Sequence, residues 1–64
     1  MIFNVIAEEE KSYKTIFSGT MGYYPRIGEK LFVNYCTFLV KDIEHIMLQG
    51  KHDPEIRLIL EQIV

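Results

Sequence analysis

The sequence predicts an all-β domain, a small closed or nearly closed barrel of about five short strands. Short apolar runs rich in Ile, Val and Phe recur along its 64 residues. Each run is bounded by Gly, Pro, Asn, Asp or a cluster of charges, which is the pattern of strands separated by turns. A chain this short builds only one core. Residues 1–64 are therefore expected to form a single small β domain.

The first two strands are predicted at residues 2–7 and 13–18, where β-branched and aromatic residues are enriched. The polar residues 8–12 between them are expected to form an exposed turn. Two glycines then follow, and the residue before Pro25 avoids the α region of backbone conformation. We therefore expect a crossing loop over residues 19–28.

The third strand is predicted at residues 31–33. Residues 25–30 lead into it, and Gly28 permits a positive φ there. Residues 34–36 are expected to form a tight turn, because Asn34 tolerates the left-handed conformation.

The longest strand is predicted within residues 37–48, and its alternation contains a conflict. A strictly alternating strand would bury two carboxylates, which is energetically costly. A β-bulge at Lys41–Asp42 removes this cost, because it shifts the phase and turns Ile43 and Met47 inward instead. We expect the bulge.

Residues 55–64 have two interpretations. Alternating apolar residues from Ile56 to Leu60 indicate a closing strand. The alternative is a C-terminal helix over residues 54–64 that covers a β-sheet, with Asp53 as its N-cap and Pro54 in its first turn. We expect the strand, because four strands precede it and a barrel needs a closing one. An exposed turn is expected over residues 49–54.

Composition excludes several classes of protein. Seven basic and nine acidic residues give a net charge of −2, without the basic excess of a general nucleic-acid binder. A hydrophobic content of 48% is too high for a disordered chain. Residues 1–8 have no basic region and end in acid, so neither a signal peptide nor a membrane span is expected. The single cysteine, Cys36, fits a reducing cytoplasm.

No motif predicts an enzyme. Cys36 has no flanking motif of a nucleophile, and residues 19–22 lack the Lys and Ser/Thr of a phosphate-binding loop. The candidate metal ligands match no standard spacing: His45, His52, Asp53 and Glu55. We expect no catalytic residue, no cofactor and no metal, and Cys36 is expected to be a half-buried apolar residue.

The side chains predicted to lie on the surface indicate an interaction with another protein. Both faces of the last two predicted strands carry apolar side chains, and exposed apolar surface usually marks an interface. Tyrosines beside basic residues in the loops are favoured anchors of protein interfaces. Together these observations favour a homo-oligomer. The candidate interface residues are Tyr23, Tyr24, Arg26, Ile59 and Ile63.

Two segments resemble a known group of proteins. Residues 25–31, with their Pro-Arg-Ile-Gly-Glu entry to a strand, and residues 38–45, which end in Val-Lys-Asp-Ile-Glu-His, are similar to short uncharacterised proteins of bacterial, prophage and phage genomes. The last strand, residues 56–61, fits the same pattern. That group looks like small SH3-like barrels, so the resemblance implies an SH3-like or OB-like barrel. It implies no activity and no catalytic residue.

We therefore expect a non-enzymatic protein-binding module that self-associates in the cytoplasm. One alternative is a module that binds single-stranded nucleic acid by base stacking. Its candidate contacts are Tyr23, Tyr24, Arg26 and Lys30. A second alternative is a phage-encoded inhibitor of a host protein, because small acidic chains can occupy a nucleic-acid-binding surface.

Overall fold

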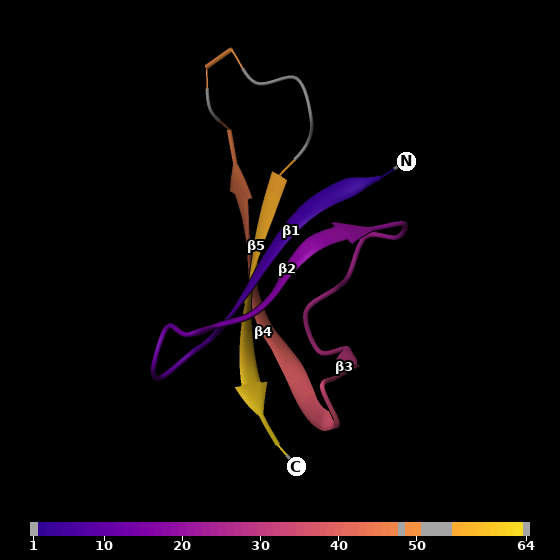
Figure 1. Cartoon of the computed structure of the whole chain (residues 1–64), viewed down its shortest axis with the longest axis vertical. Coiled ribbons are helices and arrows are strands. Elements are labelled where there is room, and N and C mark those ends of the chain that lie inside the picture. Colours follow the sequence, from indigo (N-terminus) through magenta and orange to yellow (C-terminus); the bar gives the residue numbers. More distant parts are fainter. Residues whose placement is uncertain (1, 48, 51–54, 64) are drawn as a thin grey trace.

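The computed structural model describes residues 2–47, 49–50 and 55–63. Within these residues the chain forms one five-stranded sheet and no helix (Figure 1). The strands are β1 (Phe3–Glu9), β2 (Thr15–Met21), β3 (Lys30–Val33), β4 (Cys36–Ile46) and β5 (Glu55–Gln62). The predicted all-β fold of five strands is confirmed, and so is the C-terminal strand. The alternative of a C-terminal helix over residues 54–64 is wrong.

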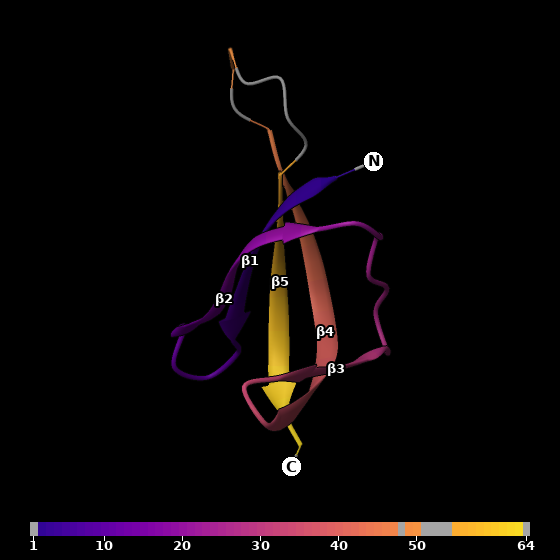
Figure 2. The same cartoon turned by 45° about the vertical axis from the view of Figure 1, so that its right-hand side comes forward.

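The sheet is curled into a half-barrel with the strand order β2-β1-β5-β4-β3. Neighbouring strands are antiparallel, except that β1 and β5 are parallel. In Figure 2 the edge strands β2 and β3 cross the long strands β4 and β5 at different heights. Neither edge pairs with the other, so the barrel stays open between β2 and β3.

The core lies on the concave side of the sheet and is formed by alternate residues of the three central strands. Its buried members are at most 5% exposed: Val5, Ala7, Phe38, Val40, Ile56, Leu58 and Leu60. Because β5 has a neighbour on each side, its three inward residues are covered from both directions. This central position explains why the alternation in residues 55–62 forms a strand and not a helix.

The predicted bulge in β4 is present. The register between β4 and β5 shifts between Val40 and Asp42, so that Lys41 is the extra residue. Ile43 consequently packs against the core, as expected. The expectation that Met47 points inward is wrong, because Met47 follows the end of β4 and is 90% exposed.

Strand β2 extends further than predicted, through residues that we expected in the loop 19–28. Met21 pairs with Phe3, and Gly19 is covered by a neighbouring ring. A Cβ at Gly19 would lie 3.1 Å from Cζ of Phe17, so glycine provides the space that this ring occupies. The strand begins after Tyr13, whose φ of 58° interrupts an extended backbone.

The hairpin between β3 and β4 is closed by two residues with positive φ, Asn34 (50°) and Tyr35 (66°). This is the geometry of a type I′ turn, whose twist matches that of the flanking strands. Cys36, expected in the turn, is the first residue of β4. Gly28 has the positive φ expected of it, 93°. The expected turn at residues 49–54 lies mostly outside the described residues.

Candidate functional site

The open side of the half-barrel is an apolar groove of about 510 Å³ between β2 and β3. Its floor consists of core side chains of β1 and β5, and its walls come from the two edge strands. The lining residues are Ala7, Phe17, Met21, Tyr23, Lys30, Leu31, Phe32, Val33, Asn34, Leu58 and Leu60.

The groove has little polar chemistry. Among the described residues that line it, Lys30 is the one charged residue, and there is no acid, histidine, serine or cysteine. No nucleophile and base are therefore brought together there. What the groove offers is apolar contact, supplemented by the polar tips of Tyr23 and Asn34 at its rim.

Open backbone edges flank the groove. Strand β2 pairs only with β1, and β3 pairs only with β4, so in the described part of the chain one side of each strand has no strand partner. Such a side presents N–H and C=O groups that can pair with an added strand. The two edges differ in how well their sequences prevent the addition of another strand. Residues 15–21 of β2 contain no charge and no proline, whereas β3 has only four residues and begins with Lys30.

The adjacent Tyr23 and Tyr24 have different environments. Tyr23 is 51% exposed and lines the groove. Tyr24 shares a hydrogen bond between its hydroxyl and Nε2 of His45, and its ring stacks on that imidazole with centroids 5.6 Å apart. The Tyr24 ring also meets Phe3 edge-on at 5.4 Å. Tyr24 therefore holds the loop after β2 against β1 and β4.

The rest of this loop is fixed to the sheet by backbone hydrogen bonds. The N–H of Gly28 donates to the carbonyl of Val40, and the N–H of Val40 donates to the carbonyl of Glu29, both at 2.9 Å. Pro25 is fully buried. The Arg26 side chain is exposed, while its N–H donates to Oε1 of Glu29 at 2.6 Å. The loop is therefore fixed against β4, and its residue Tyr23 lines the groove.

The structure does not bring the five predicted interface residues together. Ile59 lies on the convex face of β5, opposite Glu8 of β1 and Asp42 of β4. Ile63 follows β5 and is 39% exposed. Of the five, only Tyr23 lines the groove.

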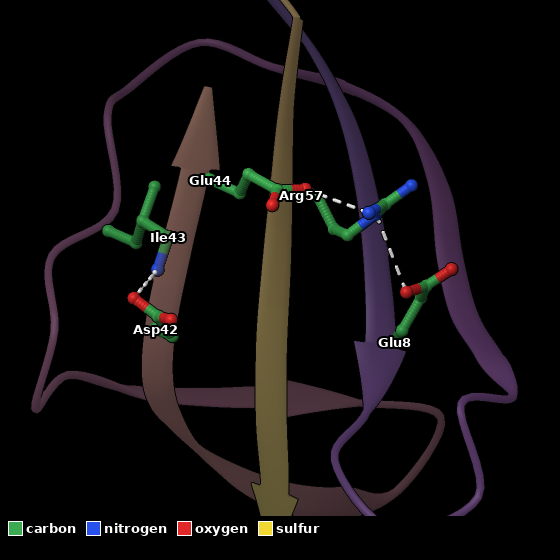
Figure 3. Close-up of polar contacts among 5 residues, drawn as sticks. All are labelled: Glu8, Asp42, Ile43, Glu44 and Arg57. Atoms are coloured by element: carbon green, nitrogen blue, oxygen red, sulfur yellow. Dashed lines mark hydrogen bonds and ion pairs between the residues drawn. The ribbon is translucent and has the colours of Figure 1, made fainter. Parts of the chain in front are cut away.

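The convex face carries charged side chains among its apolar ones. Nη1 of Arg57 lies 2.8 Å from Oε1 of Glu44, and Nε of Arg57 lies 3.5 Å from Oε1 of Glu8 (Figure 3). These contacts join β4, β5 and β1 across two neighbouring rows of the convex face. A second pair, Lys41 with Glu61, is 3.8 Å apart. Such partly exposed pairs each contribute about 1 kcal/mol or less. Because acids surround the apolar residues, this face is not a continuous apolar patch.

Sequence reasoning missed the wall of the groove contributed by β2, namely Phe17 and Met21, and the contribution of Phe32 from β3. An available signal was the uncharged run 15–21, which is unusual for an exposed edge. The hairpin also presents an aromatic pair that was missed: Phe32 is 70% exposed, and its ring lies 6.3 Å from that of Tyr35.

The side chain of Cys36 is half-buried, as expected. It packs against the core, and Nε2 of Gln62 donates to its Sγ at 3.6 Å. Among the described residues, no three His, Cys, Asp or Glu side chains come close enough to hold a metal ion. His52 and Asp53 lie outside the described residues. A helix long and apolar enough to cross a membrane does not occur in the described ranges.

Comparison with known proteins gives no relative: no protein-family model, no curated protein and no solved structure matches this chain.

Proposed function

We propose that this protein is a non-enzymatic protein-binding module that accepts an extended polypeptide segment in the groove between β2 and β3. The observation that carries the proposal is an apolar groove flanked by an unprotected strand edge. An added strand gains main-chain hydrogen bonds from such an edge, and its alternate side chains enter the groove. We also propose a cytoplasmic location, which the single cysteine of the chain supports.

The test is a selection of random linear peptides on the purified protein, followed by calorimetric measurement of the enriched peptides. We expect these peptides to alternate apolar and polar residues. Tyr23→Glu should weaken their binding about tenfold or more, because it places a charge in the groove. The matched control is Tyr13→Glu, since Tyr13 is also exposed and does not line the groove.

Two results would contradict this function. One is a monomeric protein that enriches no peptide above the background of an unrelated protein. The other is equal binding by the two tyrosine variants, because the peptides would then bind away from the groove.

The alternative of a nucleic-acid-binding module has less support. Of its candidate contacts, Tyr23 and Lys30 line the groove, whereas the Tyr24 ring is stacked on His45. A single cation in the groove and an acid-rich convex face oppose binding to phosphates. The alternative stays a prediction, tested by oligonucleotide binding at low and high salt. Inhibition of a host protein by a phage-encoded chain also stays a prediction.

A further inference from the structure

We infer that the segment which occupies the open edge is β2 of a second copy of this chain. The two β2 strands would pair antiparallel about a two-fold axis at Gly19. This inference rests on the proposed function, because it names the partner for the same edge and groove. A two-fold interface uses the same surface on both copies, so that surface must be complementary to itself.

The absence of charge makes β2 the most suitable surface for contact between two copies. The convex face would oppose its own acids, such as Glu8, Asp42 and Glu44, if two copies met there. The short edge β3 carries Lys30. Residues 15–21 contain no charge, so β2 can lie beside its own copy without repulsion.

The alternation of groove-lining and exposed side chains along β2 determines which residues of the two β2 strands lie opposite each other. Phe17 and Met21 line the groove, whereas Ser18 and Thr20 are exposed. Directly opposed residues of paired strands lie on the same face of the sheet, so a shift by one residue would place groove residues opposite exposed ones. The register centred on Gly19 places Phe17 opposite the partner's Met21 and Ser18 opposite the partner's Thr20.

Each opposed pair in this register has favourable chemistry. A thioether beside an aromatic ring is an attractive contact. Ser and Thr hydroxyls can form a cross-strand hydrogen bond. Gly19 lies opposite the partner's Gly19, where no side chain obstructs the approach, and the Phe17 ring already occupies the space above Gly19. The groove-side residues Phe17 and Met21 of both copies would then form one continuous apolar row.

The experiment measures solution mass by size-exclusion chromatography with light scattering over a range of concentrations. We expect the wild-type protein to reach twice the 7.6 kDa of the chain as concentration rises. In the variant S18K/T20K each Lys opposes a Lys of the partner at two places. This variant should raise the dimer dissociation constant about tenfold or more, and S18E/T20E should do the same.

Matched charges should restore the dimer. An equimolar mixture of S18K/T20K and S18E/T20E should form a heterodimer, and S18K/T20E should dimerise at least as well as the wild type. Both positions are exposed, so circular dichroism should show an unchanged fold in every variant. A wild type that stays monomeric, or a dimer that S18K/T20K leaves intact, would overturn the inference.

The outcome separates this inference from the proposed function. A monomeric wild type that binds selected peptides in a Tyr23-dependent manner would refute the second copy and keep the protein-binding module. A monomeric wild type that binds no peptide would refute both. A dimer that follows the charge pattern and excludes peptides supports both, with the second copy as the bound segment.

Discussion

Replacing Leu58 by alanine tests the two-faced structure of β5 most directly. Leu58 is fully buried, and it lies between Ala7 of β1 and Ile43 of β4 on the concave side. Its neighbour Ile59 points to the convex face and is partly exposed. The two residues have similar side chains and adjacent positions, so Ile59→Ala is the matched control.

The expected loss for Leu58→Ala is about 3 kcal/mol of unfolding free energy, from a range of about 2–5 for buried Leu. Ile59→Ala should lose about 1 kcal/mol, because it leaves no enclosed cavity. A domain of this length is stabilised by roughly 3–10 kcal/mol in total. The Leu58 variant should therefore lose between about a third and all of this stability, and its melting temperature should fall by roughly 12–24 °C.

Urea unfolding followed by far-ultraviolet circular dichroism measures both losses. All proteins are compared at one concentration, because association adds to apparent stability. The denaturant slope should stay constant between variants. Equal losses for Leu58→Ala and Ile59→Ala, or a larger loss for Ile59→Ala, would refute the assignment of the two faces.

Three further predictions concern the turns and the convex face. Gly28→Ala should lower the free energy of unfolding by about 1–2 kcal/mol, because Gly28 has a φ of 93° that alanine rarely adopts. Gly22 has similar free space and no positive φ, so Gly22→Ala should change the free energy of unfolding by less than about 0.5 kcal/mol. Equal effects of the two substitutions in urea unfolding would contradict the backbone explanation. Hydrogen bonds from the N–H of Lys11, and further ones from Ser12, hold the pKa of Glu9 below its usual 4.5. The stability that Glu9→Gln removes should therefore be present at neutral pH and fade as pH falls through the lowered pKa; a urea midpoint difference independent of pH would argue against this role. Arg57→Met should lower the free energy of unfolding by about 1 kcal/mol or less at low salt, and by less at high salt, because salt screens the ion pairs of Arg57. A loss of stability that does not depend on salt would show that the packing of the side chain matters and not its charge.

Much of the fold could be predicted from the sequence, because it depends on the energies of single residues and their near neighbours in the chain. The bulge in β4 follows from the cost of burying carboxylates, which depends only on residue order. The hairpin at Asn34 follows from a backbone preference of that residue. The extension of β2 could not be predicted in this way, because a glycine such as Gly19 weakens a strand and indicates a turn. Gly19 belongs to the strand through its pairing with Val5 of β1, and the ring of Phe17 lies close to it in the folded protein.

The groove could not be predicted, because its lining depends on which strands become neighbours. The parallel pairing of β1 with β5 places Ala7 beside Leu58 and leaves β2 and β3 as open edges. No short-range signal specifies that pairing. Tyr23, predicted as an interface residue from its type and loop position, lines the groove, while the adjacent Tyr24 turns toward His45 through a contact between residues 21 positions apart.

The distribution of charge across the sheet is the strongest argument that the edge of β2 is kept for pairing. Each convex row of the three central strands contains a charged residue: Glu55, Arg57 with Glu44, and Glu8 with Asp42. The same rows continue onto β2 at Thr20, Ser18 and Thr15, which are all exposed and uncharged. A single lysine there would protect the edge at no cost to the core, as is usual for exposed edges. The absence of charge from β2, beside central strands that each carry charge on the convex face, therefore supports the proposed addition of a strand at this edge.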